Sequence, residues 1–218
     1  MKRTLLAVAL MAAAGSASAV GIGIRGGTTG VGGDFGIGIA PTLSARFGFS
    51  GLNYNRSIHD TDVDYDGRLQ LRNFSALLDF SPVGPFRLTG GIVNADNRLN
   101  VTGRPTNGTY TINGHTYSSA ELGSVDGEIK GKNRVAPYLG IGYGNVSGMG
   151  VNFYADLGVI LAGGNKTSLS ANCGAAIQGT AQCDQIQADA EQERQKLDDK
   201  IRGFKVWPVI NIGVTIGF

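Results

Sequence analysis

The chain has 218 residues, a formal net charge of +2 at pH 7 and a high glycine count of 35. So balanced a charge gives no support for broad nucleic-acid binding, and the length fits a single domain. After position 19 there is no apolar run of the ~20 residues that a transmembrane helix requires.

The first 19 residues are typical of a cleavable secretory signal. Basic Lys2 and Arg3 precede an apolar stretch from Leu5 to Ala14, and an A-x-A cleavage site ends at Ala19. The apolar stretch is too short to span a membrane as a helix. We therefore expect an exported chain with one domain over residues 20–218.

Eight later segments alternate apolar residues with polar or small ones, as in β-strands whose side chains point to opposite faces in turn. In chain order they cover residues 20–28, 34–40, 43–55, 68–81, 86–99, 134–144, 149–161 and 204–218. The last is the most regular, because every even-numbered residue from Phe204 to Phe218 is apolar. Pro208 cannot donate to a strand ladder, so we expect a bulge or bend near it.

The connections between these segments alternate in length. Alternation of side chains alone would also fit a soluble β-sandwich, so the connection lengths are needed to distinguish a sandwich from a membrane barrel. Tight connections such as SPVGP and GNVSG alternate with long ones over residues 56–67, 101–133 and 163–203. In a barrel of adjacent strands, nearly all long loops then lie at one rim, as in outer-membrane barrels.

The signal, the eight strands, the loop lengths and the terminal Phe218 together resemble small eight-stranded bacterial outer-membrane β-barrel proteins. The resemblance implies an all-β, antiparallel, up-and-down transmembrane barrel in the bacterial outer membrane. It also implies contact with lipid and lipopolysaccharide and a monomeric state by default. Strands can cross lipid only as a closed barrel, and an even strand count places both mature ends in the periplasm.

In such proteins the barrel-assembly machinery reads the final aromatic residue and the alternate apolar residues before it. The matching positions here are Phe218, Ile216, Val214 and Ile212. This implied role explains a chain that ends on an aromatic residue.

The inward faces of the strands carry charges that suggest a polar network. The SPVGP turn places Asp79 opposite Arg87, with Arg46 within reach, and the GNVSG turn places Tyr138 opposite Asp156. An eight-stranded barrel is only wide enough for side chains to fill, so we interpret these residues as a hydrogen-bonded plug. The same residues would also suit a charged constriction in a narrow channel.

Three arginines follow the outward face of two strands just above the apolar band. Arg68, Arg72 and Arg98 are candidates to bind lipopolysaccharide phosphates, because arginine suits bidentate phosphate contacts. A solvated strand extension is the plainer interpretation.

The external segments contain three local signals. Cys173 and Cys183 lie close together in an exported chain, which favours a disulfide over a metal site. Asn113-Gly114 between β-formers predicts a hairpin in the loop at residues 101–133. Residues 184–202 predict a short helix across the rim, although a partly disordered surface segment would have the same composition.

No cofactor or metal is expected. Asp62, Asp64 and Asp66 resemble the opening of an EF-hand loop, but Asn73 stands where that loop requires glutamate. His59 and His115 lie in expected external loops, and nothing fixes a nucleophile beside either of them. The sequence thus favours a structural or surface-interaction protein, with a narrow channel as the alternative and a lipid-modifying enzyme as the least favoured role.

Overall fold

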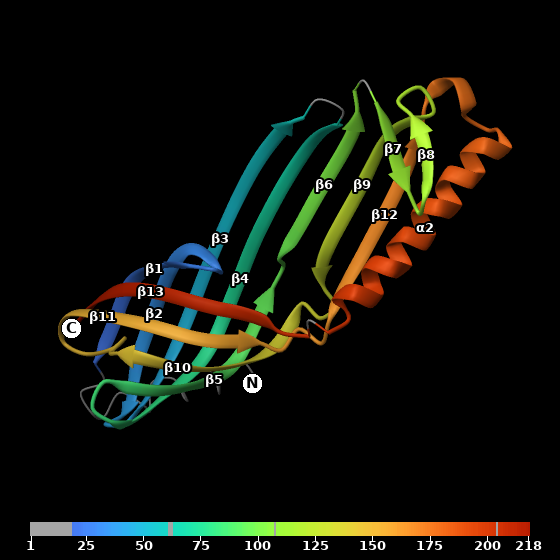
Figure 1. Cartoon of the computed structure of the whole chain (residues 1–218). Helices are drawn as coiled ribbons and strands as arrows, with labels where there is room; N and C mark the ends of the chain where they lie inside the picture. The colour runs from blue at the N-terminus through green and yellow to red at the C-terminus, as the bar shows by residue number, and fades with distance from the viewer. Residues whose placement is uncertain (1–18, 61–62, 107, 204) are drawn as a thin grey trace, which may run out of the picture.

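The computed structural model describes residues 19–60, 63–106, 108–203 and 205–218 (Figure 1). Residues 1–18 of the expected 19-residue signal, Asp62 of the acidic stretch and Phe204 of the expected last strand lie outside these described residues. Within the described ranges, no helix is both long enough and apolar enough to cross a membrane.

Eight strands form a closed antiparallel ring, which confirms the predicted barrel. The ring order is β4–β3–β2–β1–β13–β11–β10–β5, and β5 pairs again with β4. At the closure, the backbone N–H groups of Val20 and Phe218 each donate to the other residue's carbonyl, at 3.0 and 2.9 Å. The ring strands are β1 (Val20–Gly27), β2 (Gly30–Ala40), β3 (Leu43–His59), β4 (Val63–Val83), β5 (Phe86–Ala95), β10 (Val135–Gly144), β11 (Gly150–Ile160) and β13 (Trp207–Gly217).

Two ring strands continue far beyond the barrel (Figure 1). β3 has 17 residues and β4 has 21, whereas β5 has only 10. Most of the segment 56–67, expected as a loop, is therefore strand. β4 has two successive partners on one edge, because its residues from Asn73 onward pair with β5 and those up to Gln70 pair with β6.

The longer connections add strands to β3 and β4 and so build an external sheet. It runs β3–β4–β6–β9–β12, where β6 is Arg98–Pro105, β9 is Leu122–Gly131 and β12 is Asn165–Cys173. Much of residues 101–133 is thus ordered strand, and residues 163–203 consist mainly of β12 and a helical segment, which corrects the expectation of loops. The strand pattern of β12 is weak in the sequence, because the row opposite Lys166 and Ser168 begins with the polar residues Asn165 and Thr167 before Leu169.

The predicted hairpin is confirmed as β7 (Thr109–Ile112) and β8 (His115–Ser118). Its turn residues Asn113 and Gly114 have φ angles of 53° and 87°, the positive values that a two-residue hairpin turn requires.

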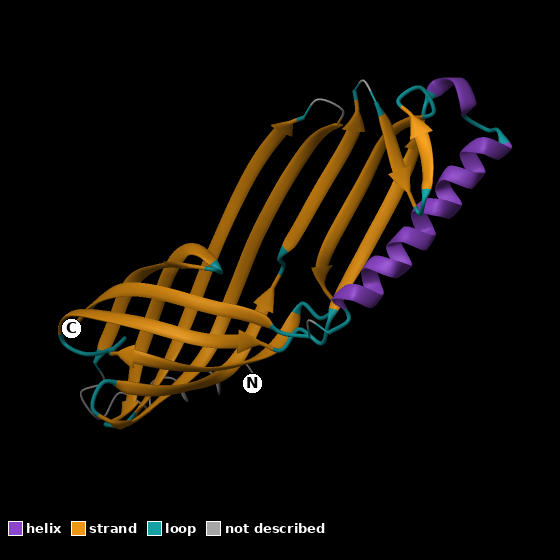
Figure 2. Cartoon of the chain, viewed as in Figure 1, coloured by secondary structure: helices purple, strands orange, loops and turns teal. Residues whose placement is uncertain are grey.

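A helical segment flanks the far edge of the external sheet, beside β12 (Figure 2). The short 3-10 helix η1 (Ala175–Ile177) precedes α2 (Ala181–Ile201), whose 21 residues make it longer than the short helix predicted. The predicted disulfide between Cys173 and Cys183 joins β12 to the start of α2. Ile186 and Ala190 of α2 are buried against Leu122 and Ala171 of the sheet.

The bulge predicted near Pro208 is not found. β13 pairs with β11 in an unbroken register that sets Pro208 opposite Val159. On its other edge, β13 pairs with β1 only as far as Asn211. Proline is tolerated at this position because the N–H that it lacks is not needed where the neighbouring strand has ended.

Candidate functional sites in the barrel and the external sheet

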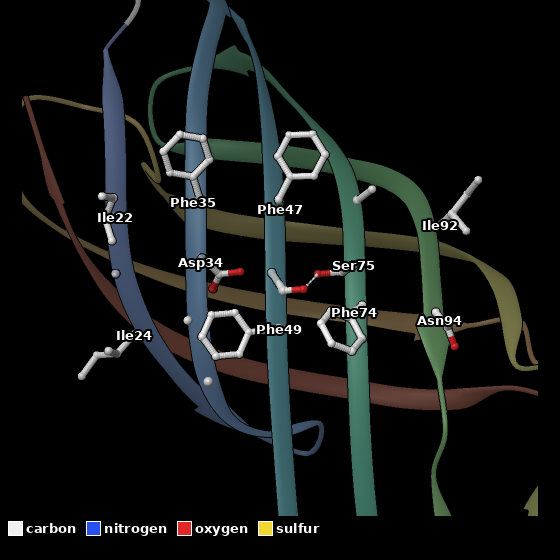
Figure 3. Close-up of a pocket in the computed structure, with 15 residues that line it drawn as sticks. Ile22, Ile24, Asp34, Phe35, Phe47, Phe49, Phe74, Ser75, Ile92 and Asn94 are labelled. Atoms are coloured by element: carbon white, nitrogen blue, oxygen red, sulfur yellow. Dashed lines mark hydrogen bonds between the residues drawn. The ribbon is translucent and has the colours of Figure 1, made fainter. Parts of the chain in front are cut away.

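The outer wall of the barrel is an apolar surface. Figure 3 shows part of it, where Phe35, Phe47, Phe49 and Phe74 line a shallow hollow of about 930 Å³ on neighbouring strands. The hollow depends on Gly33, because a Cβ added there would come within 3.0 Å of the Phe49 ring. Exposed apolar side chains also occur on the other strands, among them Ile22, Leu88, Leu139, Val151, Phe153 and Ile210.

The candidate assembly residues all lie on this wall. Phe218, Ile216 and Ile212 turn exposed side chains outward from β13, and Val214 between them is half-buried. They follow one face of the strand that closes the ring between β1 and β11.

Inside the barrel, two arginines and two aspartates form a closed ring of ion pairs. Arg46 contacts Asp79 at 3.0 Å and Asp156 at 2.5 Å, and Arg87 contacts the same two carboxylates at 3.4 and 2.8 Å. All four side chains are buried. Because β3 and β11 lie opposite each other in the strand order, the Arg46–Asp156 pair spans the lumen.

A second charged pair continues the network toward β1 and β2. Arg25 donates to Asp34 at 3.0 Å, and Tyr154 donates its hydroxyl to the same carboxylate. The Tyr154 ring lies 5.5 Å from the guanidinium of Arg46 and 5.4 Å from that of Arg87, within cation–π range. Three cations and three anions therefore balance within the lumen.

The two predicted cross-strand pairs in this network are wrong. Asp79 lies opposite Thr89, whose hydroxyl donates to it at 2.5 Å, and reaches Arg87 only along the diagonal. Val83 pairs with Phe86, so the turn is centred between Gly84 and Pro85 and not at the middle of SPVGP, and the register also shifts between Phe80 and Val83. Tyr138 lies opposite Ile160 and stands outside the ion-pair ring.

Asp156 instead lies opposite Gly142 and Asn211. A Cβ at Gly142 would meet Arg87 Nη2 at 2.7 Å and Asp156 at 2.8 Å, so this glycine makes room for the ion pairs. Gly142, Tyr154 and Thr89 are not among the residues that the sequence predicts for this network. Tyr154 lies two residues before Asp156 on the same strand, so its side chain also points inward, and this spacing could have identified it from the sequence.

Apolar and backbone groups close the lumen on both sides of the network. Toward the external end, Tyr138 packs with Leu77, Val93, Ala136, Ile160 and Val209. At the other end, Val146 of the β10–β11 connection is buried, and its carbonyl lies where a side chain on Gly21 would be. An internal cavity of about 20 Å³ beside Tyr138 has room for about one water molecule.

The external sheet has a polar face, continuous with the lipid-facing side of β3 and β4. Arg68, Arg72 and Arg98 all lie on it, since the register sets Arg98 opposite Gln70 and Arg68 opposite Asn100. Arg98 is paired with Asp96 at 2.9 Å. Among the described residues, no acidic side chain pairs with Arg68 or Arg72.

The row that contains Arg98 is cationic across three strands. Arg98 lies opposite Lys130 of β9, which lies opposite Lys166 of β12. Neighbouring strands are about 5 Å apart, and like charges directly opposite one another are unfavourable. Lys130 is partly balanced by Glu128, whereas no acidic partner for Lys166 occurs in the described part of the chain.

The helix and the hairpin are tied together by one buried carboxylate. Asp189 of α2 accepts hydrogen bonds from Tyr117 and Asn113, and it contacts His115 Nδ1 at 2.7 Å. The hydrogen bond from Tyr117 has the largest effect on the pKa of Asp189. Together these bonds lower that pKa to about 2, against the opposing effect of burial. Burial and the bond to Asp189 raise the pKa of Tyr117 to about 12.

Neither a protein-family model nor a curated protein sequence matches this chain. Solved structures do match. The crystal structure of CarO from Acinetobacter baumannii aligns with a TM-score of 0.62 at 21% identity, over 91% of this chain and 97% of CarO. CarO2 from the same organism aligns with a TM-score of 0.62 at 23% identity, over 92% of this chain and 98% of that one.

The chain has a CarO-like barrel fold. The match supports the resemblance drawn from the sequence, because CarO is a small eight-stranded outer-membrane β-barrel protein. It covers the external part as well as the barrel, since almost the whole of each chain is aligned. At this level of identity the likeness concerns the fold alone.

Proposed function

We propose that this protein is a closed outer-membrane β-barrel whose working surface is the external sheet with its helix and hairpin. The observation that carries the proposal is the filled lumen, in which the ring of Arg46, Asp79, Arg87 and Asp156 lies between two further closures. A solute would have to displace buried ion pairs, and removing one partner of such a pair leaves a costly unpaired charge.

Conductance tests this proposal. The mature chain is refolded in detergent, its folding is verified by a mobility shift between unboiled and boiled samples, and it is inserted into a planar bilayer. We expect no steady unitary current. A steady current that changes in Asp79→Ala would overturn the proposal and make the protein a narrow channel for small solutes, with the network as its constriction.

We assign the polar face of the external sheet a role at the outer leaflet. Arg72 lies one outward position above Phe74 of the apolar wall, and Arg98, Lys130 and Lys166 continue a cationic row across the sheet. Farther from the barrel the same face no longer has an excess of cations, since Arg104 is paired with Asp66. There the Asp126 carboxylate, which accepts hydrogen bonds from the uncharged Thr102 and Asn172, adds negative charge. Cations nearest the apolar band fit the phosphates of lipopolysaccharide.

Binding to vesicles with and without lipopolysaccharide tests this role. A cation near an anionic membrane surface contributes about 1 kcal/mol, so Arg72→Gln and Lys166→Gln should each weaken binding about fivefold. Arg104→Gln removes the same charge from a paired residue farther along the face and serves as the matched control. Equal losses in all three variants would contradict a specific phosphate contact.

The proposal also covers the location of the protein, its assembly and its lack of a catalytic role. The protein resides in the bacterial outer membrane as a monomer, and the assembly machinery reads Phe218 and the alternate apolar residues of β13. We assign no catalytic role, because His115 is bonded to Asp189 and its neighbour on that carboxylate is the Tyr117 hydroxyl. Lipid hydrolysis or acyl transfer lost in His59→Ala and His115→Ala together would overturn that assignment.

A further inference from the structure

The outer part of β3 is an open strand edge. β2 pairs with β3 only as far as Gly51, whereas β4 pairs with it as far as His59. Residues 52–59 thus have one strand neighbour among the described residues, and Figure 1 shows this end of β3 as the outermost strand of the external sheet. The opposite edge of that sheet, β12, is flanked by α2.

The backbone groups that face this open edge can be identified. Ser81 donates its N–H to the carbonyl of Thr42 at 2.7 Å, and the β3–β4 register continues unbroken from there to His59. In an antiparallel pair, hydrogen-bonded and non-hydrogen-bonded residues alternate. Even-numbered residues of β3 therefore bond to β4, and the N–H and C=O groups of residues 53, 55, 57 and 59 point to the open edge.

The side chains along this edge are polar on one face of the sheet and mainly apolar on the other. Asn53, Asn55 and Ser57 lie on the polar face of the sheet. On the other face, Leu52, Tyr54 and Ile58 are 40%, 51% and 54% exposed. Natural sheets blunt free edges with charged residues, with proline or with a covering element. This stretch contains no proline and no lysine, has Arg56 as its one basic residue of the Lys/Arg type, and has no covering element among the described residues.

The apolar side of the edge continues an apolar row across the external sheet, in which Leu99 is also 40% exposed. The register aligns Tyr54 with Leu69, Leu99 and Ile129 in one row across four strands. Farther along the same face, the hairpin and α2 cover Val125 and Ala171. The end of the face at β3 lacks such a cover, and Arg56 on it has no acidic partner among the described residues.

We propose that residues 52–59 of β3 bind an extended segment of another protein by strand addition. The segment pairs with the open backbone groups, turns apolar side chains to the face of Tyr54 and Ile58, and places an acidic residue opposite Arg56. Strand addition takes its affinity from main-chain hydrogen bonds and its specificity from alternate side chains. This inference rests on the proposed surface role and names the class of partner for it.

The test uses the refolded full barrel and a synthetic peptide. The peptide is a nonamer that alternates threonine with valine, with glutamate at the inward position that faces Arg56. Controls are the same peptide with lysine for glutamate, and one N-methylated at alternate residues so that it cannot donate to a strand. Binding is followed by fluorescence polarisation and by amide hydrogen exchange resolved for each residue by NMR.

Without peptide, we expect fast exchange at residues 53, 55, 57 and 59 and slow exchange at 54, 56 and 58. The peptide should slow the four fast amides, whereas the N-methylated control should not. Asn55→Pro removes one edge donor while sparing the ladder to β4, so it should weaken binding about tenfold. Asn55→Ala, the matched control, should bind like the original chain, because Asn55 contributes through its backbone.

Three results would overturn the proposal. One is equal binding of the N-methylated and unmodified peptides. Another is protection of the edge that grows with protein concentration and needs no peptide, which would make a second copy the occupant. The third is slow exchange at residues 53–59 at every concentration, which would show that the edge is already covered. A bilayer recording on the same preparation reports separately on the closed lumen, so the two proposals can fail independently.

Discussion

β3 and β4 cross two environments, and the polarity of their faces reverses between them. In the barrel, Phe47 and Phe74 face outward, while Arg46 and Asp79 face the lumen. Beyond the barrel, the outward face carries polar side chains such as Arg68, and the inward face carries Leu69 and Tyr54. Strand parity is unbroken throughout. The solvent on each side has changed, and the sequence changes with it.

The two regions also differ in what stabilises them. The barrel has lipid outside, so its interior can hold buried ion pairs, with each charge matched by an opposite one. The external sheet has water on its polar face, so its stability must come from an apolar core under α2 and the hairpin. Charge removal should therefore damage the barrel interior far more than the external sheet.

The largest effect is expected from Asp156→Ala. This change leaves Arg46 and Arg87 buried without one of their two carboxylates, and breaking a buried pair typically costs 3–5 kcal/mol, so about that loss is expected here. The free energy of unfolding, measured in urea by gel mobility, should fall by this amount. The matched substitution Asp126→Ala on the polar face of the external sheet should cost about 1 kcal/mol. If both variants lost a similar free energy of unfolding, the proposed difference between the two regions would be wrong.

The next effect concerns the disulfide. Replacing Cys173 and Cys183 together by serine removes a covalent constraint between residues 10 positions apart in the sequence. The loss of a disulfide typically lowers the free energy of unfolding by about 2–4 kcal/mol. The loss should be local to α2 and the external sheet. Limited proteolysis should therefore cleave the helix sooner, while the mobility shift of the barrel persists. A barrel that also loses its mobility shift would show that the two regions fold as one unit.

This comparison also explains which features the sequence could predict. The eight ring strands, the closing Phe218 and the inward charges follow from strict alternation, because lipid imposes the same rule on every strand. Alternation does not reveal β12 and β6, because the inner row of β12 begins with the polar residues Asn165 and Thr167, and the apolar row of β6 has only Leu99 and Val101 before Gly103. Cross-strand partners such as Thr89 for Asp79 depend on bulges and turn geometry, which alternation does not encode.

The smallest effect is expected from pH at Asp189. Its hydrogen bonds, first from Tyr117, hold its pKa at about 2, below the ordinary value of 3.8. A carboxyl group whose pKa is lowered by folding contributes its full stabilisation at pH values above its ordinary pKa. That contribution is lost as the pH falls through the lowered pKa of about 2. The contact between the hairpin and α2 should therefore loosen between about pH 4 and pH 2, while the barrel, whose ion pairs are enclosed, stays folded.

Amide chemical shifts of the hairpin, followed by NMR over this range, measure the loosening. Asp189→Asn has no carboxyl group to protonate, so its shifts at Asn113, His115 and Tyr117 should stay constant between pH 4 and pH 2. Ser118 is left out of this comparison because its N–H donates to the Glu121 carboxylate, whose pKa is also lowered. Tyr117→Phe removes the bond that contributes most to the depressed pKa, so its transition should move to higher pH. If the transition stayed at the same pH in Tyr117→Phe, the stabilisation of the external region at low pH would have to come from groups other than this carboxylate and its partners.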